Sequence, residues 1–219
     1  MNYRVAEIFL SINGEGPRAG ELAAFVRLAG CNLACRWCDT RWACTEDAPA
    51  EELTEEQILE TIAEYHVKNV TLTGGEPLLA PHAADLLHAL SRAGFRVEIE
   101  TNGSVGLALF CDIDRVSFTM DYKLPGSGME DAMLPENFRL LGPEDSVKFV
   151  VSSRGDLLRA WEVSEEYLTD SPAQIFLSPV FGEIEPAEIV DFLKEKCWTR
   201  ARLQIQLHKV IWDPAARGV

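Results

Sequence analysis

The feature of this sequence that most constrains its fold is the alternation of short strand-like runs with longer segments of helical periodicity. This alternation is typical of repeated β-α units around a parallel sheet. Strands are predicted at residues 24–28, 69–73, 96–101, 115–120, 147–152, 174–178 and 203–207. Several of these runs are mostly apolar, which predicts strands covered on both faces. The sequence therefore predicts an α/β fold.

Two of the intervening segments carry clear helix signals. Residues 54–65 begin with Thr54 and Gln57, which form the pair of a capping box. Residues 81–92 repeat apolar side chains at helical spacing, and Gly94 follows as a C-cap. In a β/α fold of this kind, the chemistry lies where loops leave the carboxyl ends of the strands.

Length and composition are those of one globular domain. The chain has 219 residues, 47% of them hydrophobic and 25% charged, which suffices for a packed core. No repeat or low-complexity tract divides it, so we expect a single barrel-like domain over residues 1–219. Residues 124–128, with the sequence LPGSG, read as an exposed loop.

The charge balance limits the partners. Thirty-five acidic and twenty basic residues give a net charge of −15, which repels nucleic acid and anionic membranes. The sequence shows neither an export signal nor a run of about twenty apolar residues. We therefore expect a cytoplasmic protein with no nucleic-acid or membrane partner. In that setting its six cysteines indicate metal or redox chemistry rather than disulfides.

Three cysteines lie close together directly after the first predicted strand. Cys31, Cys35 and Cys38 are separated by three and then two residues in the segment 31–40. Three thiolates at this spacing can hold one 4Fe-4S cluster and leave one iron open to another ligand. The spacing therefore predicts an iron-sulfur site with a vacant corner.

A structural zinc site is the alternative explanation of these cysteines. Such a site needs a fourth ligand, for which Cys44 or His66 is available. A chance group of buried cysteines is disfavoured, because Arg36 and Asp39 make this a poor core segment. The other cysteines are isolated in the sequence and are expected to be buried thiols: Cys44, Cys111 and Cys197.

With an aromatic residue, Trp37, immediately before the third cysteine, the motif resembles the signature of radical S-adenosylmethionine (SAM) enzymes. That resemblance implies a partial (open) parallel β/α barrel with a cluster loop at 31–40, in which SAM chelates the open iron. Residues 71–77, TLTGGEP, resemble the glycine-rich stretch that meets the methionine end of SAM. The SAM contacts implied by the resemblance are Trp37, Cys38, Asp39, Gly75, Glu76, Glu100, Asp121, Tyr122 and Lys123. Taken alone, the glycines are a strand-to-helix turn, and Glu100 is a solvated rim carboxylate.

The N-terminal segment 7–20, EIFLSINGEGPRAG, narrows the resemblance to the 7-carboxy-7-deazaguanine synthase family. Arg27 before the first cysteine, Thr40 after the third and the closing segment 203–214 match the same family. The resemblance implies conversion of 6-carboxy-5,6,7,8-tetrahydropterin to 7-carboxy-7-deazaguanine with loss of ammonia, on the way to deazapurines such as queuosine. SAM cleavage would give the radical that takes hydrogen from the substrate, and SAM would be regenerated.

The same family resemblance implies the substrate site, a magnesium site and the partners. The implied substrate contacts are the backbone of Ile12, Asn13 and Gly14, and the residues Glu15, Arg27, Thr73, Gln206 and His208. Mg²⁺ would bind the hydroxyl of Thr40, a flavodoxin or ferredoxin would supply electrons, and the protein would be a homodimer. From the residues alone, Arg27 is also interpretable as an ion-pair partner of Glu15, Thr40 as a helix cap and His208 as a core histidine.

Two other functions share parts of these patterns. A glycyl-radical activating enzyme, which acts on a partner protein, has the same cysteine signature and a similar size. A non-catalytic zinc-binding interaction module would use the acidic surface to recruit a basic partner. The N-terminal EGP segment together with Arg27 favours a small-molecule substrate over the activating enzyme. Colour separates the zinc module, because a cluster is brown when purified without oxygen and a zinc protein is colourless.

Overall fold

Nine strands form one sheet in the computed structural model, which describes residues 1–219. The strands are β1 (Asn2–Ile12), β2 (Leu22–Leu28), β3 (Glu51–Thr54), β4 (Asn69–Gly74), β5 (Arg96–Thr101), β6 (Val116–Tyr122), β7 (Ser146–Val151), β8 (Gln174–Pro179) and β9 (Ala201–Leu203). Their order is β3-β1-β2-β4-β5-β6-β7-β8-β9. From β2 to β9 all neighbours are parallel, whereas β1 pairs antiparallel with β2 and β3. The edge strands do not pair with each other, which confirms the predicted open barrel.

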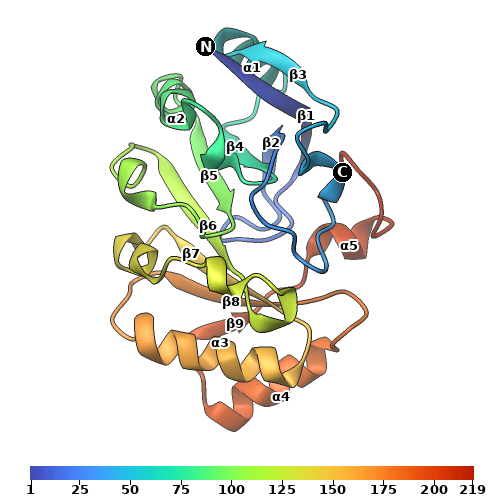
Figure 1. Ribbon diagram of the computed structural model, residues 1–219, viewed down its shortest axis with the longest axis vertical. Helices are drawn as coiled ribbons and strands as arrows, with labels where there is room; N and C mark the ends of the chain where they lie inside the picture. The colour runs from blue at the N-terminus through green and yellow to red at the C-terminus, as the bar shows by residue number, and fades with distance from the viewer.

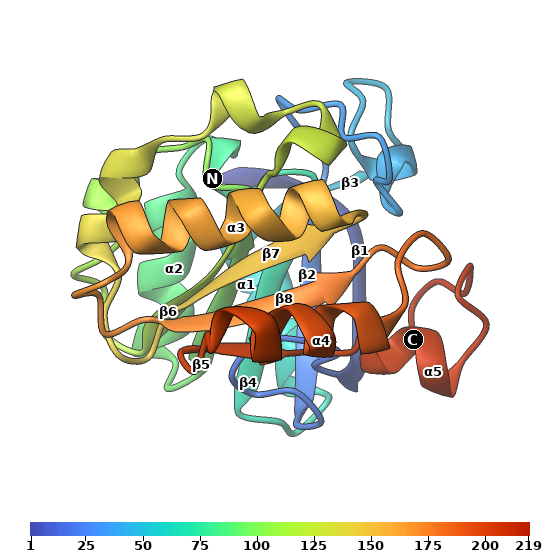
Figure 2. The same cartoon turned by 90° about the horizontal axis from the view of Figure 1, so that it is seen from below.

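The outer face of the curved sheet is covered by α1 (Glu55–Ala63), α2 (Ala83–Arg92), α3 (Arg154–Tyr167) and α4 (Pro186–Lys196). The short α5 (Leu207–Ile211) lies apart from them, to one side of the sheet (Figure 1). Figures 1 and 2 show α3 and α4 side by side over the β7 to β9 end of the sheet, with α1 and α2 at the opposite end. No helix combines the length and the apolar character that a membrane crossing requires.

Both predicted helices are confirmed with their caps. Thr54 and Gln57 form a capping box at the start of α1. The apolar side of α2 is buried in the core, and Gly94 follows that helix with a φ of +90°. A left-handed residue directly after a helix favours glycine, which has no Cβ to clash.

Side chains along the parallel strands alternate between an apolar outer face and a polar inner face. In β5, Val97 and Ile99 are buried in the main core, whereas Glu98 and Glu100 point to the inner face. The prediction of strands covered on both faces is therefore wrong for this sheet. The reason is that helices cover one face only, and the other face lines a polar cavity.

Six of the seven predicted strands are confirmed, with ends that differ by two residues or fewer. The seventh, at 203–207, is wrong, because β9 ends at Leu203 and α5 begins at Leu207. The alternating QIQL pattern has a different cause. Gln204 accepts a hydrogen bond from the Gly16 N–H and donates one to the Gly16 carbonyl, both at 2.9 Å. These side chains bind a loop instead of extending the sheet.

Strands β1 and β3 were not predicted from the sequence. β1 has no regular alternation of buried and exposed residues, and its pairing with β2 is irregular between Val5 and Glu7. β3 has only four residues. The hairpin of β1 and β2 matters for function, because its connection places Glu15 against the inner face of the sheet, next to Lys148 and Ser178.

Glu98 makes the stability of this fold depend on pH. It is 3% exposed and accepts hydrogen bonds from Thr119 at 2.6 Å and Arg18 at 3.5 Å. Burial raises the pKa of its carboxyl from 4.5 to about 7. An acid with a raised pKa in the folded state stabilises the fold below its unfolded pKa, and this contribution is lost as pH rises through 7.

We therefore expect Glu98→Gln to remove a pH-dependent destabilisation. Between pH 5 and 8 the free energy of unfolding of the wild type should fall by on the order of 3 kcal/mol relative to the variant, at about 1.4 kcal/mol per pKa unit. Urea titrations of both chains at several pH values measure this difference. A difference in the free energy of unfolding between the two proteins that stays constant from pH 5 to 8 would rule out titration of Glu98.

Candidate active site

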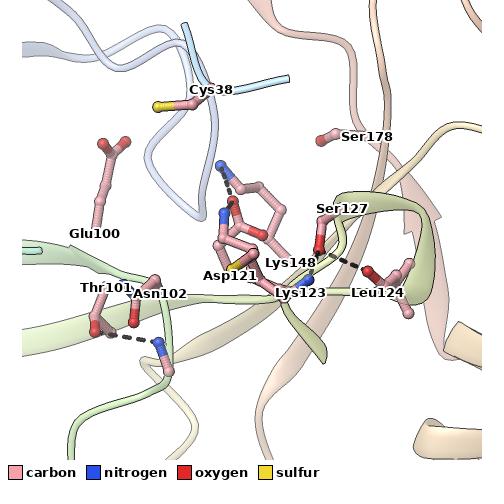
Figure 3. A network of polar contacts seen from close by, with 12 residues as sticks. Cys38, Glu100, Thr101, Asn102, Asp121, Lys123, Leu124, Ser127, Lys148 and Ser178 are labelled. Carbon is pink, nitrogen blue, oxygen red and sulfur yellow. Dashed lines mark hydrogen bonds and ion pairs between the residues drawn. The ribbon is translucent and has the colours of Figure 1, made fainter. Parts of the chain in front are cut away.

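A cavity of about 600 Å³ opens at the carboxyl edge of the parallel strands. It brings together side chains from distant parts of the sequence, and Figure 3 shows Asp121, Lys123 and Lys148 close to one another, with Cys38 and Glu100 on neighbouring segments. The predicted site residues that line it are Ile12, Gly14, Glu15, Arg27, Cys31, Cys35, Trp37, Cys38, Asp39, Thr40, Thr73, Gly75, Glu100, Asp121, Lys123, Gln206 and His208. Asn13, Glu76 and Tyr122 do not line it.

The three predicted cluster ligands, Cys31, Cys35 and Cys38, lie on the loop that follows β2, and all of them face this cavity. Hydrogen-bond donors surround two of the sulfurs. The Leu33 N–H lies 3.4 Å from the Cys31 Sγ, and the Thr40 hydroxyl lies 3.7 Å from the Cys38 Sγ. Such donors stabilise thiolates, which are the form that binds iron.

Cys44 is not isolated, in contrast to the sequence-based expectation. A short 3-10 helix at Arg41–Ala43 turns the chain back toward the cysteine loop. As a result, the Cys44 Sγ lies 3.9 Å from the Cys38 Sγ, and the Cys44 carbonyl accepts a hydrogen bond from the Cys31 N–H. Hydrogen bonding by the Cys44 thiol lowers the pKa of both Cys31 and Cys38 to about 6. Burial raises the pKa of Cys35 instead. Two of the three predicted ligands are thus readily deprotonated.

The arrangement fits a cluster better than a single zinc ion. No three His, Cys, Asp or Glu side chains converge closely enough to hold one ion, although Cys44 is near. His66, the other fourth ligand considered, is exposed and lies outside the cavity. The three thiols line one cavity, as three ligands of a 4Fe-4S cluster must.

The segment at residues 124–128 is only partly the exposed loop that the sequence indicates, because Pro125 and Gly128 are exposed whereas two other residues are buried. Leu124 and Ser127 are 0% and 1% exposed, because this segment forms a short 3-10 helix against the cluster loop. The Ser127 carbonyl accepts a hydrogen bond from the Arg36 N–H at 3.0 Å. The segment is therefore hydrogen-bonded to the loop that carries the three cysteines.

Gly75 lies in van der Waals contact with the backbone of the cysteine loop. A Cβ at this position would stand 2.2 Å from the Gly30 carbonyl oxygen and 2.7 Å from the Cys31 Cβ. The Gly75 N–H donates to the Leu28 carbonyl, and the Glu76 N–H donates to the Gly30 carbonyl. The glycine is therefore required by packing at the site, beyond its use in a turn.

The side chain of Glu76 does not reach the cavity. It is 2% exposed and accepts hydrogen bonds from the Leu78 N–H, the Thr101 hydroxyl and the Asn102 N–H. The prediction of a SAM contact by this side chain is thus not supported. Glu76 instead holds Asn102, whose Nδ2 lies 3.8 Å from the Cys31 Sγ.

The carboxyl ends of β5 and β6 present two acidic side chains. Glu100 accepts a hydrogen bond from the Thr73 hydroxyl at 2.8 Å, so it is more than a solvated rim carboxylate. The Asp121 Oδ2 pairs with the Lys123 Nζ at 2.8 Å, while the Asp121 Oδ1 is buried without a partner. A buried oxygen without a donor indicates a place for a ligand N–H or O–H.

Tyr122 points away from these groups. Strand alternation places it on the outer face, between Asp121 and Lys123, which point inward. Its ring stacks on Phe138 with centroids 5.6 Å apart, and its hydroxyl donates to Glu130. The prediction of a SAM contact by the Tyr122 side chain is therefore not supported.

Arg27 lies on the inner face of β2. Its Nε donates to the Glu7 Oε1 at 2.7 Å, so the alternative of an ion pair with Glu15 is wrong. The terminal guanidinium nitrogens have no hydrogen-bond partner within the chain, and the residue lines the cavity. Arg27 can therefore donate a bidentate pair of hydrogen bonds to an anion such as a carboxylate.

Glu15 has three hydrogen-bond donors. Its Oε2 accepts from the Lys148 Nζ at 2.9 Å and the Gln206 Nε2 at 3.0 Å, and its Oε1 accepts from the Ser178 hydroxyl at 2.7 Å. Burial would raise the pKa of Glu15, but the charge of Lys148 and these hydrogen bonds lower it to about 2. Glu15 is ionised at neutral pH.

The predicted backbone contacts at residues 12–14 are only partly available. The Asn13 N–H donates to the Glu21 carbonyl, the Asn13 carbonyl accepts from the Gly20 N–H, and its side-chain oxygen accepts from Thr71. Asn13 thus shapes the loop and has no free backbone group for a substrate. Ile12 and Gly14 do line the cavity.

His208 lies at the cavity and not in the core. Its ring packs on Gly14, where a Cβ would stand 2.3 Å from the His208 Nδ1. Burial lowers the pKa of His208, so the ring is neutral at pH 7. Thr40 precedes a 3-10 helix without capping it, so the capping alternative does not hold.

The end of the chain closes one side of the cavity, which sequence reasoning did not foresee. Residues 214–219 line it, and Figure 1 shows the C-terminus beside the segment that follows β2. The Lys209 ammonium lies 3.4 Å from the Asp39 carboxylate. The Arg217 guanidinium lies 4.6 Å from the centre of the Trp42 ring.

Other lining residues that were not predicted from the sequence include Asn102, Lys148, Val180 and Phe181. Lys148 had a usable signal, because it is the one charged residue in the strand-like run 146–151. Val180 and Phe181 directly follow β8, where the strand-end rule applies.

Three comparisons with known proteins agree with this geometry. The radical SAM superfamily model matches residues 25–122. The 7-carboxy-7-deazaguanine synthase of Clostridium acetobutylicum is 52% identical over 221 residues, covering 100% of both chains, and that of Leptospira interrogans is 37% identical, covering 98% and 97%. The crystal structure of QueE from Escherichia coli is 26% identical, with a TM-score of 0.75 and 94% of each chain covered.

Similarity along the whole chain, together with three cysteines on a strand-end loop and an open parallel barrel, leads to one assignment. This chain belongs to the radical SAM superfamily and, within it, to the 7-carboxy-7-deazaguanine synthase family.

Proposed function

We propose that this protein converts 6-carboxy-5,6,7,8-tetrahydropterin to 7-carboxy-7-deazaguanine with release of ammonia, in the biosynthesis of deazapurines such as queuosine. The observation that carries the proposal is one cavity that contains three cysteine thiols, an arginine with free donors and a buried carboxylate. The relatives named 7-carboxy-7-deazaguanine synthase support the same reaction.

The cysteines and the residues near them would hold the cofactors. Cys31, Cys35 and Cys38 would bind three irons of a 4Fe-4S cluster and leave the fourth open for SAM. When bound, the cluster and SAM supply the radical that removes a hydrogen atom from the substrate. Two observations support the SAM site: the buried Asp121 Oδ1 has no hydrogen-bond donor within the chain, and Gly75 packs against the loop that carries the cysteines. Trp37, Glu100 and Lys123 would complete it.

The other side of the cavity would bind the pterin. Arg27 would hold the substrate carboxylate through its two free guanidinium nitrogens. Glu15, which is ionised, would accept a hydrogen bond from an N–H of the ring. Gln206, His208 and Thr73 would make further polar contacts from the cavity wall.

Magnesium, the electron donor and the assembly state are proposed from family membership. Thr40 offers a hydroxyl at the cavity, and Mg²⁺ accepts sparse protein ligation when substrate oxygens and water complete its shell. A flavodoxin or ferredoxin would supply the electron. A homodimer and a cytoplasmic location remain predictions.

A glycyl-radical activating enzyme is not favoured, because the full-length relatives carry the name of the deazaguanine synthase. The deciding experiment is anaerobic turnover of the reconstituted protein with SAM, reductant and the carboxylated pterin, followed by mass analysis. We expect the mass of 7-carboxy-7-deazaguanine, recovery of SAM, and no product from Cys35→Ala as the cluster-free control. An intact cluster without product would refute the proposal.

A further inference from the structure

A buried lysine, Lys148, stands at the centre of the inner face without a role in the function proposed above. It is 8% exposed, lies in the middle of β7 and lines the cavity. Its Nζ lies 2.9 Å from the Glu15 Oε2 and 3.6 Å from the Asp121 Oδ2. A lysine is rarely buried unless its charge is paired with a carboxylate. We therefore ask which of the two carboxylates Lys148 serves.

The distances assign Lys148 to Glu15 rather than to Asp121. Asp121 has a closer lysine, because the Lys123 Nζ lies 2.8 Å from its Oδ2. Glu15 has no other cation, and its remaining donors, Ser178 and Gln206, are neutral. Each carboxylate therefore has its own lysine, and Figure 3 shows both lysines with Asp121 in one group.

The lone pairs of Glu15 show what this pairing leaves free. An ionised carboxylate has about four acceptor positions, and three donors occupy three of them. One position, on the Oε1, is left for a group in the cavity. Only an N–H or O–H of a ligand can use it, and only while Glu15 is ionised.

We propose that Lys148 is a positioning residue for the pterin, which keeps the Glu15 carboxylate ionised and oriented so that it accepts an N–H of the substrate ring. This inference rests on the proposed function. Without Lys148, the buried Glu15 would take up a proton and present an O–H to the N–H of the ring, and two donors would then face each other.

Other charged groups surround the pair and define the pH test. Glu100 from β5, and Asp121 and Lys123 at the end of β6, act on Lys148 through their charge, and the His208 ring of α5, which is neutral at pH 7, lies near Glu15. In Lys148→Met, Asp121 loses the more distant of its two cations and keeps Lys123 at 2.8 Å, whereas Glu15 is left without any cation. We therefore expect kcat/KM of this variant to rise with pH between 5 and 8 as Glu15 loses its proton. In the wild type, Glu15 is ionised over this whole range and should cause no such rise.

The experiment is a double-mutant cycle of Lys148→Met and Glu15→Gln in the reconstituted protein. We expect Lys148→Met to raise the KM for the pterin roughly 10- to 100-fold at pH 7, in line with a hydrogen bond to a charged group, with iron content and SAM affinity unchanged. The double variant should be no worse than Glu15→Gln alone. Lys194→Met, on the exposed face of α4, is the matched control and should behave as wild type.

Three results would overturn the inference: losses that multiply in the double variant, a fall in kcat with KM unchanged, or a weakened SAM affinity in Lys148→Met. If Lys148→Met does not fold, Glu15→Gln and the double variant decide, because neither contains an unpaired Glu15 charge. Equal KM values then support the positioning role, and a further rise contradicts it. Absence of product from the wild type would instead refute the proposed function.

Discussion

Gly75→Ala is expected to abolish turnover by displacing the cysteine loop. The added Cβ would stand 2.2 Å from the Gly30 carbonyl oxygen and 2.7 Å from the Cys31 Cβ, distances that packed atoms do not adopt. The obstacle is backbone, so no side-chain rotation relieves it. Metal ligands must stay within about 0.5 Å of their productive positions, so a shift of Cys31 should prevent cluster binding.

Iron analysis after anaerobic reconstitution measures this effect. We expect Gly75→Ala to bind far less iron than the wild type and to give no detectable product. Gly106→Ala is the matched control, because its φ is −65° and nothing lies within 4 Å of an added Cβ. Full iron content in Gly75→Ala would show that the loop tolerates the methyl group, and the packing argument would then fail.

Arg27→Gln is expected to lose substrate affinity while the cofactor site stays intact. The guanidinium is bound through its Nε to Glu7 and has two terminal nitrogens free to bind a carboxylate. Loss of one partner of a desolvated charge pair typically costs 2–5 kcal/mol, so kcat/KM for the pterin should fall roughly 10²- to 10³-fold. Steady-state kinetics, with iron content and SAM affinity as reference, measure it.

Two further variants separate charge from geometry at Arg27. Arg27→Lys keeps the charge without the planar fork and should recover only part of the activity. Glu7→Gln removes the charged partner that orients Arg27 and should have a small effect, because the free nitrogens remain. A kcat/KM near that of the wild type in Arg27→Gln would exclude Arg27 as the carboxylate ligand.

Local patterns predicted much of the fold. The capping box of Thr54 and Gln57 and the buried face of α2 depend on residues within one or two turns, so the sequence specifies them directly. The spacing of Cys31, Cys35 and Cys38 likewise predicted a shared site, since neighbours on one short loop cannot lie far apart. The prediction of a strand at residues 203–207 was wrong for the opposite reason, because Gln204 and Gln206 bind a loop that lies 188 and 191 residues away in the sequence.

The sequence by itself determined the alternating strands and helices, the three-cysteine loop and the glycine turn after β4, because each depends on contacts between close neighbours. Only the tertiary structure decided that Lys148 meets Glu15 across 133 residues, that Cys44 returns to Cys38, and that Tyr122 faces away from the cavity. These outcomes depend on strand register and sheet curvature. A shift of one residue reverses the face of every side chain, and only long-range packing selects the register.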